Sequence, residues 1–172
     1  MTRWHISHAD ILDVDADGLI CSANPSLNLS GGVGGAFLLR YGSEMQDFLH
    51  DYLRSSNQRV LKPGTAIVAP SFGSRFTAIA HAVAIDVFYD TNADLIRATY
   101  ESAINQLAAA SCRTIAAACI ACGYGRCSTQ MFLRAITPLI ANSFNGIDTI
   151  TLATTNTELA NDIAEFISRQ KS

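Results

Sequence analysis

The sequence predicts an α/β domain in which helices cover both faces of a central sheet. Short, continuously apolar runs alternate along the chain with segments that repeat apolar residues at helical spacing. Continuously apolar strands are typical of sheets buried on both faces, and such sheets need a layer of helices on each side. The length of 172 residues suits one domain, so we expect residues 1–172 to form a single domain.

The first third of the chain predicts two strands followed by two helices. A strand is expected at residues 4–7 and a second at 18–23, where a short apolar run is bracketed by turn residues. A helix begins at Ala36, directly after a glycine-rich loop. A second helix spans residues 43–55, because its apolar side chains recur three and four positions apart.

The middle of the chain predicts two buried strands and a long helix. Residues 65–69 and 77–85 are small or β-branched and continuously apolar. The long helix covers residues 94–110, which carry apolar residues at helical spacing. His81 lies in the second strand among small apolar residues, so we interpret it as a core histidine.

The last third repeats the alternation of strand and helix twice. Residues 114–121 form an apolar strand, and Ser128 is placed to cap a helix over residues 129–142. A strand at 149–153 and an amphipathic helix at 157–170 follow. Together, the elements predict a three-layer α/β/α domain.

Four glycines within five residues separate the strand at 18–23 from the helix that follows it. Residues 31–35 read GGVGG, without the lysine of a P-loop and without the G-x-G-x-x-G spacing of dinucleotide-binding folds. Glycine lets the backbone approach a ligand closely, and a helix start adds the positive end of its dipole. The run therefore predicts a phosphate or diphosphate site, with a tight turn that binds nothing as the alternative.

A second glycine cluster, Gly123 and Gly125, follows the strand expected at 114–121. In parallel α/β sheets, ligands bind outside the carboxyl ends of the strands. Two glycine loops on this rim can close on one diphosphate from both sides. Asp86 and Tyr89 follow another strand end and are within reach of the same rim.

Composition limits the functional class. The residues are 49% hydrophobic and 16% charged, as in globular proteins, and the net charge of −3 argues against nucleic-acid binding. The apolar runs are too short to cross a membrane, and no signal peptide is evident. Five cysteines without an export signal indicate reduced thiols in a cytoplasm. Cys119-x-x-Cys122 lacks a second ligand pair for zinc, so we expect structural thiols, no metal and no cofactor.

The motifs and their order resemble the macro domain family. Asp10-Ile11, the strand that ends at Asn24 and the GGVGG run are similar to the family's Gly-Asp-Ile-Thr turn, Val-Asn-Ala-Ala-Asn strand end and Gly-Gly-Gly-Val loop. His81 begins a segment similar to its Ile-His-x-Val strand, and the second glycine cluster resembles its second substrate loop. The resemblance covers residues 10–156 and implies a macro-like domain with a mixed, mostly parallel sheet. Family members bind ADP-ribose, and many hydrolyse ADP-ribosyl or O-acetyl-ADP-ribose esters.

The resemblance also implies which residues bind ADP-ribose. Asp10 would accept a hydrogen bond from the adenine amino group, and Asn24 would bind the distal ribose and is the candidate catalytic residue. The two glycine loops would hold the diphosphate through backbone N–H groups. The implied ligand-binding residues are Asp10, Ile11, Asn24, Gly31, Gly32, Val33, Gly34, Gly35, Ala121, Cys122, Gly123, Tyr124, Gly125, Arg126 and Asn156.

Two positions depart from the family's pattern and leave the activity open. Cys21 stands where the first loop asparagine usually lies, and Gly34 occupies the position of the acidic residue used by a hydrolytic subfamily. The expected function is ADP-ribose binding with hydrolysis of O-acetyl-ADP-ribose or of ADP-ribosylated protein, in which the ligand's own phosphate orients the water. The alternatives are a non-catalytic ADP-ribose reader and a domain that binds another nucleotide diphosphate.

Overall fold

The computed structural model describes residues 1–123 and 125–170. The strands are β1 Arg3–His8, β2 Gly18–Ser22, β3 Thr65–Pro70, β4 Ala78–Val83, β5 Thr114–Ala118 and β6 Thr149–Thr154. The helices are α1 Gly32–Tyr41, α2 Glu44–Ser55, α3 Ala93–Ala109, α4 Thr129–Ala141 and α5 Thr157–Gln170, with a 3-10 turn, η1, at Ile11–Asp13.

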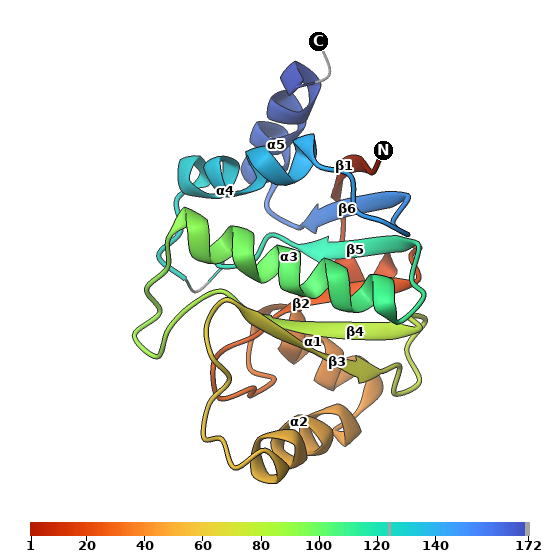
Figure 1. Cartoon of the computed structure of the whole chain (residues 1–172), viewed down its shortest axis with the longest axis vertical. Coiled ribbons are helices and arrows are strands. Elements are labelled where there is room, and N and C mark those ends of the chain that lie inside the picture. Colours follow the sequence, from red (N-terminus) through yellow and green to blue (C-terminus); the bar gives the residue numbers. More distant parts are fainter. Residues whose placement is uncertain (124, 171–172) are drawn as a thin grey trace.

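The strands form one mixed sheet in the order β1-β6-β5-β2-β4-β3. The first five strands in this order are parallel, and β3 pairs with β4 in the antiparallel direction at one edge. Helix α3 crosses the front of the sheet in Figure 1, and α1 lies behind it. The predicted three-layer α/β/α fold with a mixed, mostly parallel sheet is therefore confirmed. The carboxyl ends of the parallel strands face the left side of Figure 1.

Two of the predicted boundaries are wrong, and both fall at the glycine loops. Helix α1 begins at Gly32 instead of Ala36, so three of the four glycines lie in its first turn. Gly31 precedes the helix with a φ of 61°, a conformation that suits glycine. Strand β5 ends at Ala118 instead of residue 121, since the chain turns sharply at Ala121, whose φ is also positive at 65°. The other predicted elements are confirmed to within two residues.

His81 is a buried core residue, as predicted, with 1% of its surface exposed. Its Nε2 atom lies 3.2 Å from the sulfur of Met45 on α2, and its Nδ1 atom has no hydrogen-bond partner among the residues that the structure describes. Burial disfavours the charged ring and lowers the pKa of His81 from 6.5 to about 4. The ring is therefore neutral in the native protein at neutral pH.

We expect His81 to make the fold sensitive to acid. The unfolded chain binds this proton near pH 6.5 and the native protein only near pH 4, so stability present above pH 6.5 is lost as the pH falls toward 4. This loss amounts to about 3 kcal/mol for a shift of this size. Urea unfolding of wild type and His81→Leu at pH 7 and pH 4.5 tests this. Between pH 7 and pH 4.5, the free energy of unfolding should fall by about 2 kcal/mol more in wild type than in the variant. An equal fall in both proteins would contradict the assignment of His81 as a buried, neutral histidine.

Candidate functional site

A cleft of about 680 Å³ opens at the carboxyl ends of the parallel strands. The ends of β2, β5 and β6 line it, together with the segments that follow β1, β2, β4, β5 and β6. Its volume lies within the range of small-molecule binding sites. Both predicted glycine loops line this cleft, although Gly31 and Gly123 are 92 positions apart in the sequence.

The first wall of the cleft is the start of helix α1. The Gly35 N–H donates to the Gly31 carbonyl at 2.8 Å and makes the first hydrogen bond of the helix. The N–H groups of Gly32, Val33 and Gly34 therefore have no acceptor within the helix, and all three residues line the cleft. A side-chain carbon built on Gly32 would meet nothing within 4 Å. The wall thus offers open backbone donors, which is how helix starts bind anions. Gly35 itself does not line the cleft.

Helix α2 fixes the loop that precedes this wall. The Gln46 side chain accepts the Leu29 N–H at 2.6 Å and donates to the Leu27 carbonyl at 2.9 Å. The His50 Nε2 atom lies 2.9 Å from the Asn28 Oδ1 atom. The sequence carries no signal for these supporting residues beyond their place on an amphipathic helix. They were missed because their partners become neighbours only when α2 packs beside the loop.

Asn24 closes the same loop on itself. Its amide donates to the Asn28 carbonyl at 2.9 Å and accepts the Asn28 N–H at 3.1 Å. Asn24 also lines the cleft, where one N–H and one lone pair of its amide remain for a ligand. The structure therefore makes Asn24 a positioning residue for the first loop and leaves it within reach of a bound molecule.

Neither of the two departures from the family pattern brings a catalytic group into the cleft. Cys21 is 1% exposed and does not line the cleft, and burial raises the pKa of its thiol to about 12. Gly34 lies at the wall, but a side-chain carbon there would be 3.3 Å from both Cα and Cδ2 of Leu29. The first wall thus presents backbone groups to the cleft, without a catalytic side chain at either position.

Asp10 lies at one end of the cleft, together with Ile11. One oxygen of its carboxylate accepts the Leu12 N–H at 2.9 Å and caps η1, and the other pairs with Arg40 at 3.0 Å. Arg40 also pairs with Asp13 at 2.6 Å, so the guanidinium ties α1 to the turn that carries Asp10. Among the described residues that line the cleft, Asp10 alone is charged.

The second wall is the loop after β5, and a buried tyrosine supports it. The Tyr100 hydroxyl donates to the Ala118 carbonyl at 2.5 Å and accepts the Ile120 N–H at 3.4 Å. A side-chain carbon on Gly125 would lie 2.5 Å from the Ala121 carbonyl oxygen, so the loop folds tightly against its own start. Cys122 and Gly123 line the cleft beside them.

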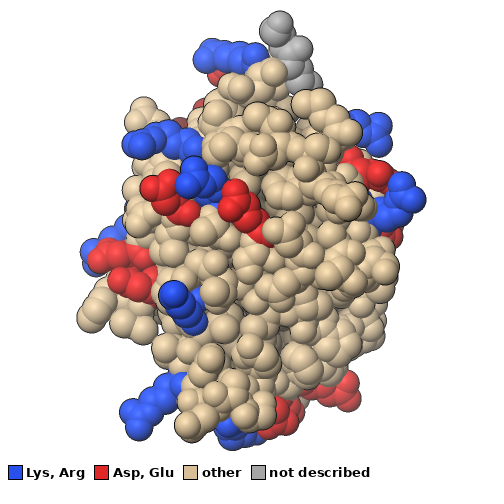
Figure 2. All heavy atoms as spheres, in the orientation of Figure 1, with Lys and Arg blue, Asp and Glu red and all other residues tan. Residues whose placement is uncertain are grey.

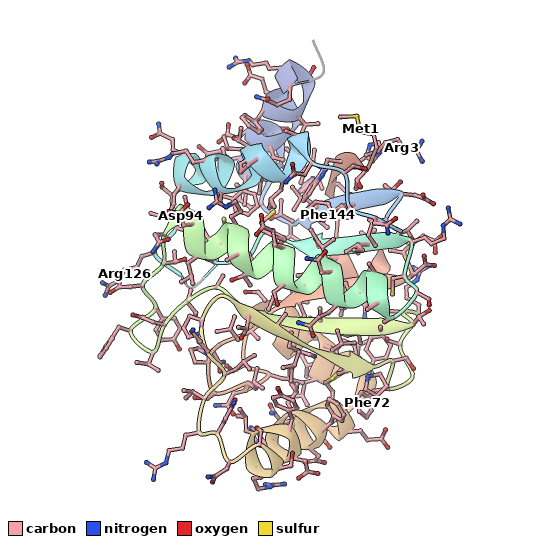
Figure 3. The ribbon with its side chains drawn as sticks, in the orientation of Figure 1. Met1, Arg3, Phe72, Asp94, Arg126 and Phe144 are labelled. Atoms are coloured by element: carbon pink, nitrogen blue, oxygen red, sulfur yellow. The ribbon has the colours of Figure 1, made fainter. Side chains whose placement is uncertain are left out.

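Arg126 does not line the cleft. Its side chain donates to Asp90 at 3.0 Å, and its N–H donates to the Tyr89 carbonyl at 3.3 Å. Figure 3 shows Arg126 at the edge of the molecule, beside the loop between β4 and α3. Arg126 thus joins that loop to the second wall, and Tyr89 lines the cleft instead. Tyr124, also predicted, lies outside the described residues.

The last predicted residue, Asn156, lines the cleft after β6. Its side chain also accepts the Leu159 N–H at 3.0 Å and caps α5. Asp86, which was expected near the rim, uses its carboxylate to accept the N–H groups of Phe88 and Asp90 and does not line the cleft.

Charged side chains are scattered over the front face of the molecule. On the face in Figure 2, charged side chains lie singly or in small groups of opposite sign, separated by uncharged surface. Within residues 1–123 and 125–170, no three His, Cys, Asp or Glu side chains are grouped to hold a metal ion. No helix in the same residues is long and apolar enough to span a membrane.

Comparison with known proteins identifies the family. A model of the Macro domain family matches residues 20–136, which is more than half of the chain. The chain belongs to the macro domain family. The resemblance seen in the sequence motifs is confirmed.

Relatives of this macro domain include bacterial and protozoan proteins. A mutant of the Oceanobacillus iheyensis macrodomain with ADPR superimposes with a TM-score of 0.86 at 20% identity, over 96% of this chain and 92% of that one. The Trypanosoma brucei macrodomain in complex with ADP-ribose superimposes with a TM-score of 0.76 at 17% identity, over 95% of this chain and 68% of that one. An O-acetyl-ADP-ribose deacetylase of Citrobacter rodentium (strain ICC168) is 32% identical over 82 residues, 48% of this chain. The match spans 45% of the deacetylase, which is less than half of that protein's length. Ester hydrolysis by the present chain is therefore treated below as a proposal.

Proposed function

We propose that this macro domain binds ADP-ribose and hydrolyses ADP-ribose conjugates. The observation that carries the proposal is the start of α1, where three N–H groups without helical acceptors line a cleft faced by a second glycine loop. No Lys or Arg is among the described residues that line it, so a bound anion is held by backbone donors. Two glycine loops suit the two phosphates of a diphosphate. The macrodomains solved with ADPR and ADP-ribose favour this ligand over other diphosphates.

Asp10 provides the specificity for adenine in this proposal. Each carboxylate oxygen already accepts one hydrogen bond, and each has a second lone pair. The adenine amino group only donates and can use such a lone pair, whereas guanine presents a carbonyl oxygen at the same position. The Arg40 pair holds the carboxylate at the end of the cleft.

Hydrolysis in this cleft proceeds without a carboxylate beside the reacting ribose. Gly34 offers no base, and Cys21 points into the core with a thiol whose pKa is raised. The first loop, held by Asn24 and Gln46, would orient the distal ribose, and the ligand's phosphate would position the attacking water. The likeness to an O-acetyl-ADP-ribose deacetylase supports an ester as the bond that is cleaved.

A non-catalytic ADP-ribose reader is the second candidate. It is favoured by the same two positions, Cys21 and Gly34, because neither supplies an acidic or amide side chain to the cleft. A reader needs the diphosphate and adenine contacts alone. The two candidates therefore share the binding site and differ only in turnover.

Calorimetry with ADP-ribose, followed by single-turnover assays, tests the proposal. The substrates are O-acetyl-ADP-ribose and a peptide mono-ADP-ribosylated on glutamate. We expect binding and cleavage of at least one ester. Binding without cleavage of either substrate would establish the reader, and absence of ADP-ribose binding would reject both candidates.

We expect Asp10→Ala to weaken ADP-ribose binding by about 1–3 kcal/mol, because the adenine amino group loses its acceptor. Asp13→Ala is the matched control, since Asp13 also pairs with Arg40 but does not line the cleft. The control should bind within about twofold of wild type. Equal affinity of wild type for ADP-ribose and GDP-ribose would show that Asp10 does not read the base.

A negative charge at Gly32 should abolish ADP-ribose binding. The position has open space toward the cleft and a φ of 48°, so Gly32→Glu places a carboxylate where the diphosphate is expected. Gly32→Gln carries the same backbone strain and bulk without the charge. Calorimetry should show that the glutamate variant binds ADP-ribose about tenfold or more weakly than the glutamine variant. Equal affinities of the two variants would place the diphosphate elsewhere.

A further inference from the structure

Two thiols lie together at the base of the second wall. The sulfur of Cys122 is 3.9 Å from the sulfur of Cys127, and both side chains are partly buried. A disulfide needs a separation of about 2.05 Å, so the sulfurs must close by roughly 2 Å. Sequence interpretation had placed Cys119 within a strand and treated these cysteines as structural. Because β5 ends at Ala118, they lie in a loop at the cleft instead.

The two thiols have different chemical environments. Cys122 donates a hydrogen bond to Cys127, which lowers the pKa of Cys127 and raises that of Cys122. Cys127 also directly precedes Ser128, the cap of α4, and a helix start stabilises a thiolate. Cys127 is therefore the nucleophile of the pair, and Cys122 is the resolving thiol.

We propose that Cys122 and Cys127 form a reversible disulfide on reaction with hydrogen peroxide, and that this bond weakens ligand binding in the cleft. The Cys127 thiolate attacks a peroxide oxygen, breaks the O–O bond, releases hydroxide that becomes water and leaves a sulfenic acid. The Cys122 thiol then attacks that sulfur, the S–O bond breaks and a second water leaves. Two thiols are oxidised to one disulfide, and one hydrogen peroxide is reduced to two waters. The effect on binding rests on the proposed function.

Two described residues next to the cysteine pair, Gly125 and Arg126, are held in place by their neighbours. Gly125 packs so closely on Ala121 that a single carbon on it would clash. Arg126 is tied by its N–H to Tyr89 and by its side chain to Asp90. We expect the backbone of Cys122 and Gly123, two residues that line the cleft, to shift when the sulfurs approach. The donors expected for the diphosphate then move away from their binding geometry.

Two other cysteines provide the comparison. Cys119 also lines the cleft, with its sulfur 3.9 Å from the Ala153 carbonyl, and is the competing partner for Cys122. Cys112 is buried just before β5, at the opposite end of that strand from the cleft. Cys112→Ala therefore removes a thiol without touching the loop and serves as the control variant.

The experiment treats reduced protein with stoichiometric hydrogen peroxide. We expect a mass loss of about 2 Da and a peptide map that joins Cys122 to Cys127. The affinity for ADP-ribose should fall by about tenfold and return after reduction with dithiothreitol. Cys127→Ser should bind ADP-ribose like wild type when reduced and should show no fall after peroxide. Cys112→Ala should respond like wild type.

Other outcomes would overturn the inference. These are a disulfide to Cys119, sulfinic acid without a disulfide, or a Cys122–Cys127 bond that leaves the ADP-ribose affinity unchanged. Hydrogen exchange in residues 119–128 gives a readout that is independent of the ligand. Altered exchange after oxidation supports the coupling between the bond and the loop, and identical exchange contradicts it. Failure of the reduced protein to bind ADP-ribose would instead reject the proposed function.

Discussion

The position of strand β2 determines where both walls of the cleft lie. This strand pairs with β4 on one side and β5 on the other, and it is buried from Gly18 to Cys21. Asp17, just before it, accepts the N–H groups of Arg113 and Thr114 at 2.8 and 2.9 Å, which lowers the pKa of its carboxyl. The Asp17 carbonyl also accepts the Thr77 N–H at 2.7 Å. These bonds align β2, β4 and β5 at their amino ends, so the loops that follow the strands emerge at one rim.

In the proposed function, the cleft binds an anion through fixed backbone dipoles, which agrees with a protein whose net charge is −3. Backbone donors at the start of α1 are already ordered by the helix, so binding requires little additional loss of conformational freedom. Their precision depends on the residues behind them. Gln46 holds the first loop and Tyr100 holds the second, each by two hydrogen bonds to the backbone.

The same design separates binding from catalysis. The adenine and diphosphate contacts that we propose depend on Asp10 and on glycine backbone, and Asp10, Gly32 and Gly34 line the cleft. The side chains that could activate water at the first wall are absent, because Cys21 is turned into the core and Gly34 is packed on Leu29. The second wall, in contrast, carries two reactive side chains, because the thiols of Cys122 and Cys127 are in contact there. The proposed hydrolysis would therefore depend more on how the ligand is held than on any one acid or base.

The sequence by itself determined the family, the order of the elements and the rim on which both glycine loops lie. Apolar periodicity and glycine positions are local properties, so β2, β5 and the two loops could be recognised without contacts. Only the tertiary structure decided how the side chains are used. Asn24 binds its own loop, Arg126 turns away to Asp90, and Cys127 meets Cys122, because each partner is chosen by packing in space. Helix α1 also begins four residues early, since its first turn leaves N–H groups free for solvent or ligand and so tolerates glycines that a helix interior would not.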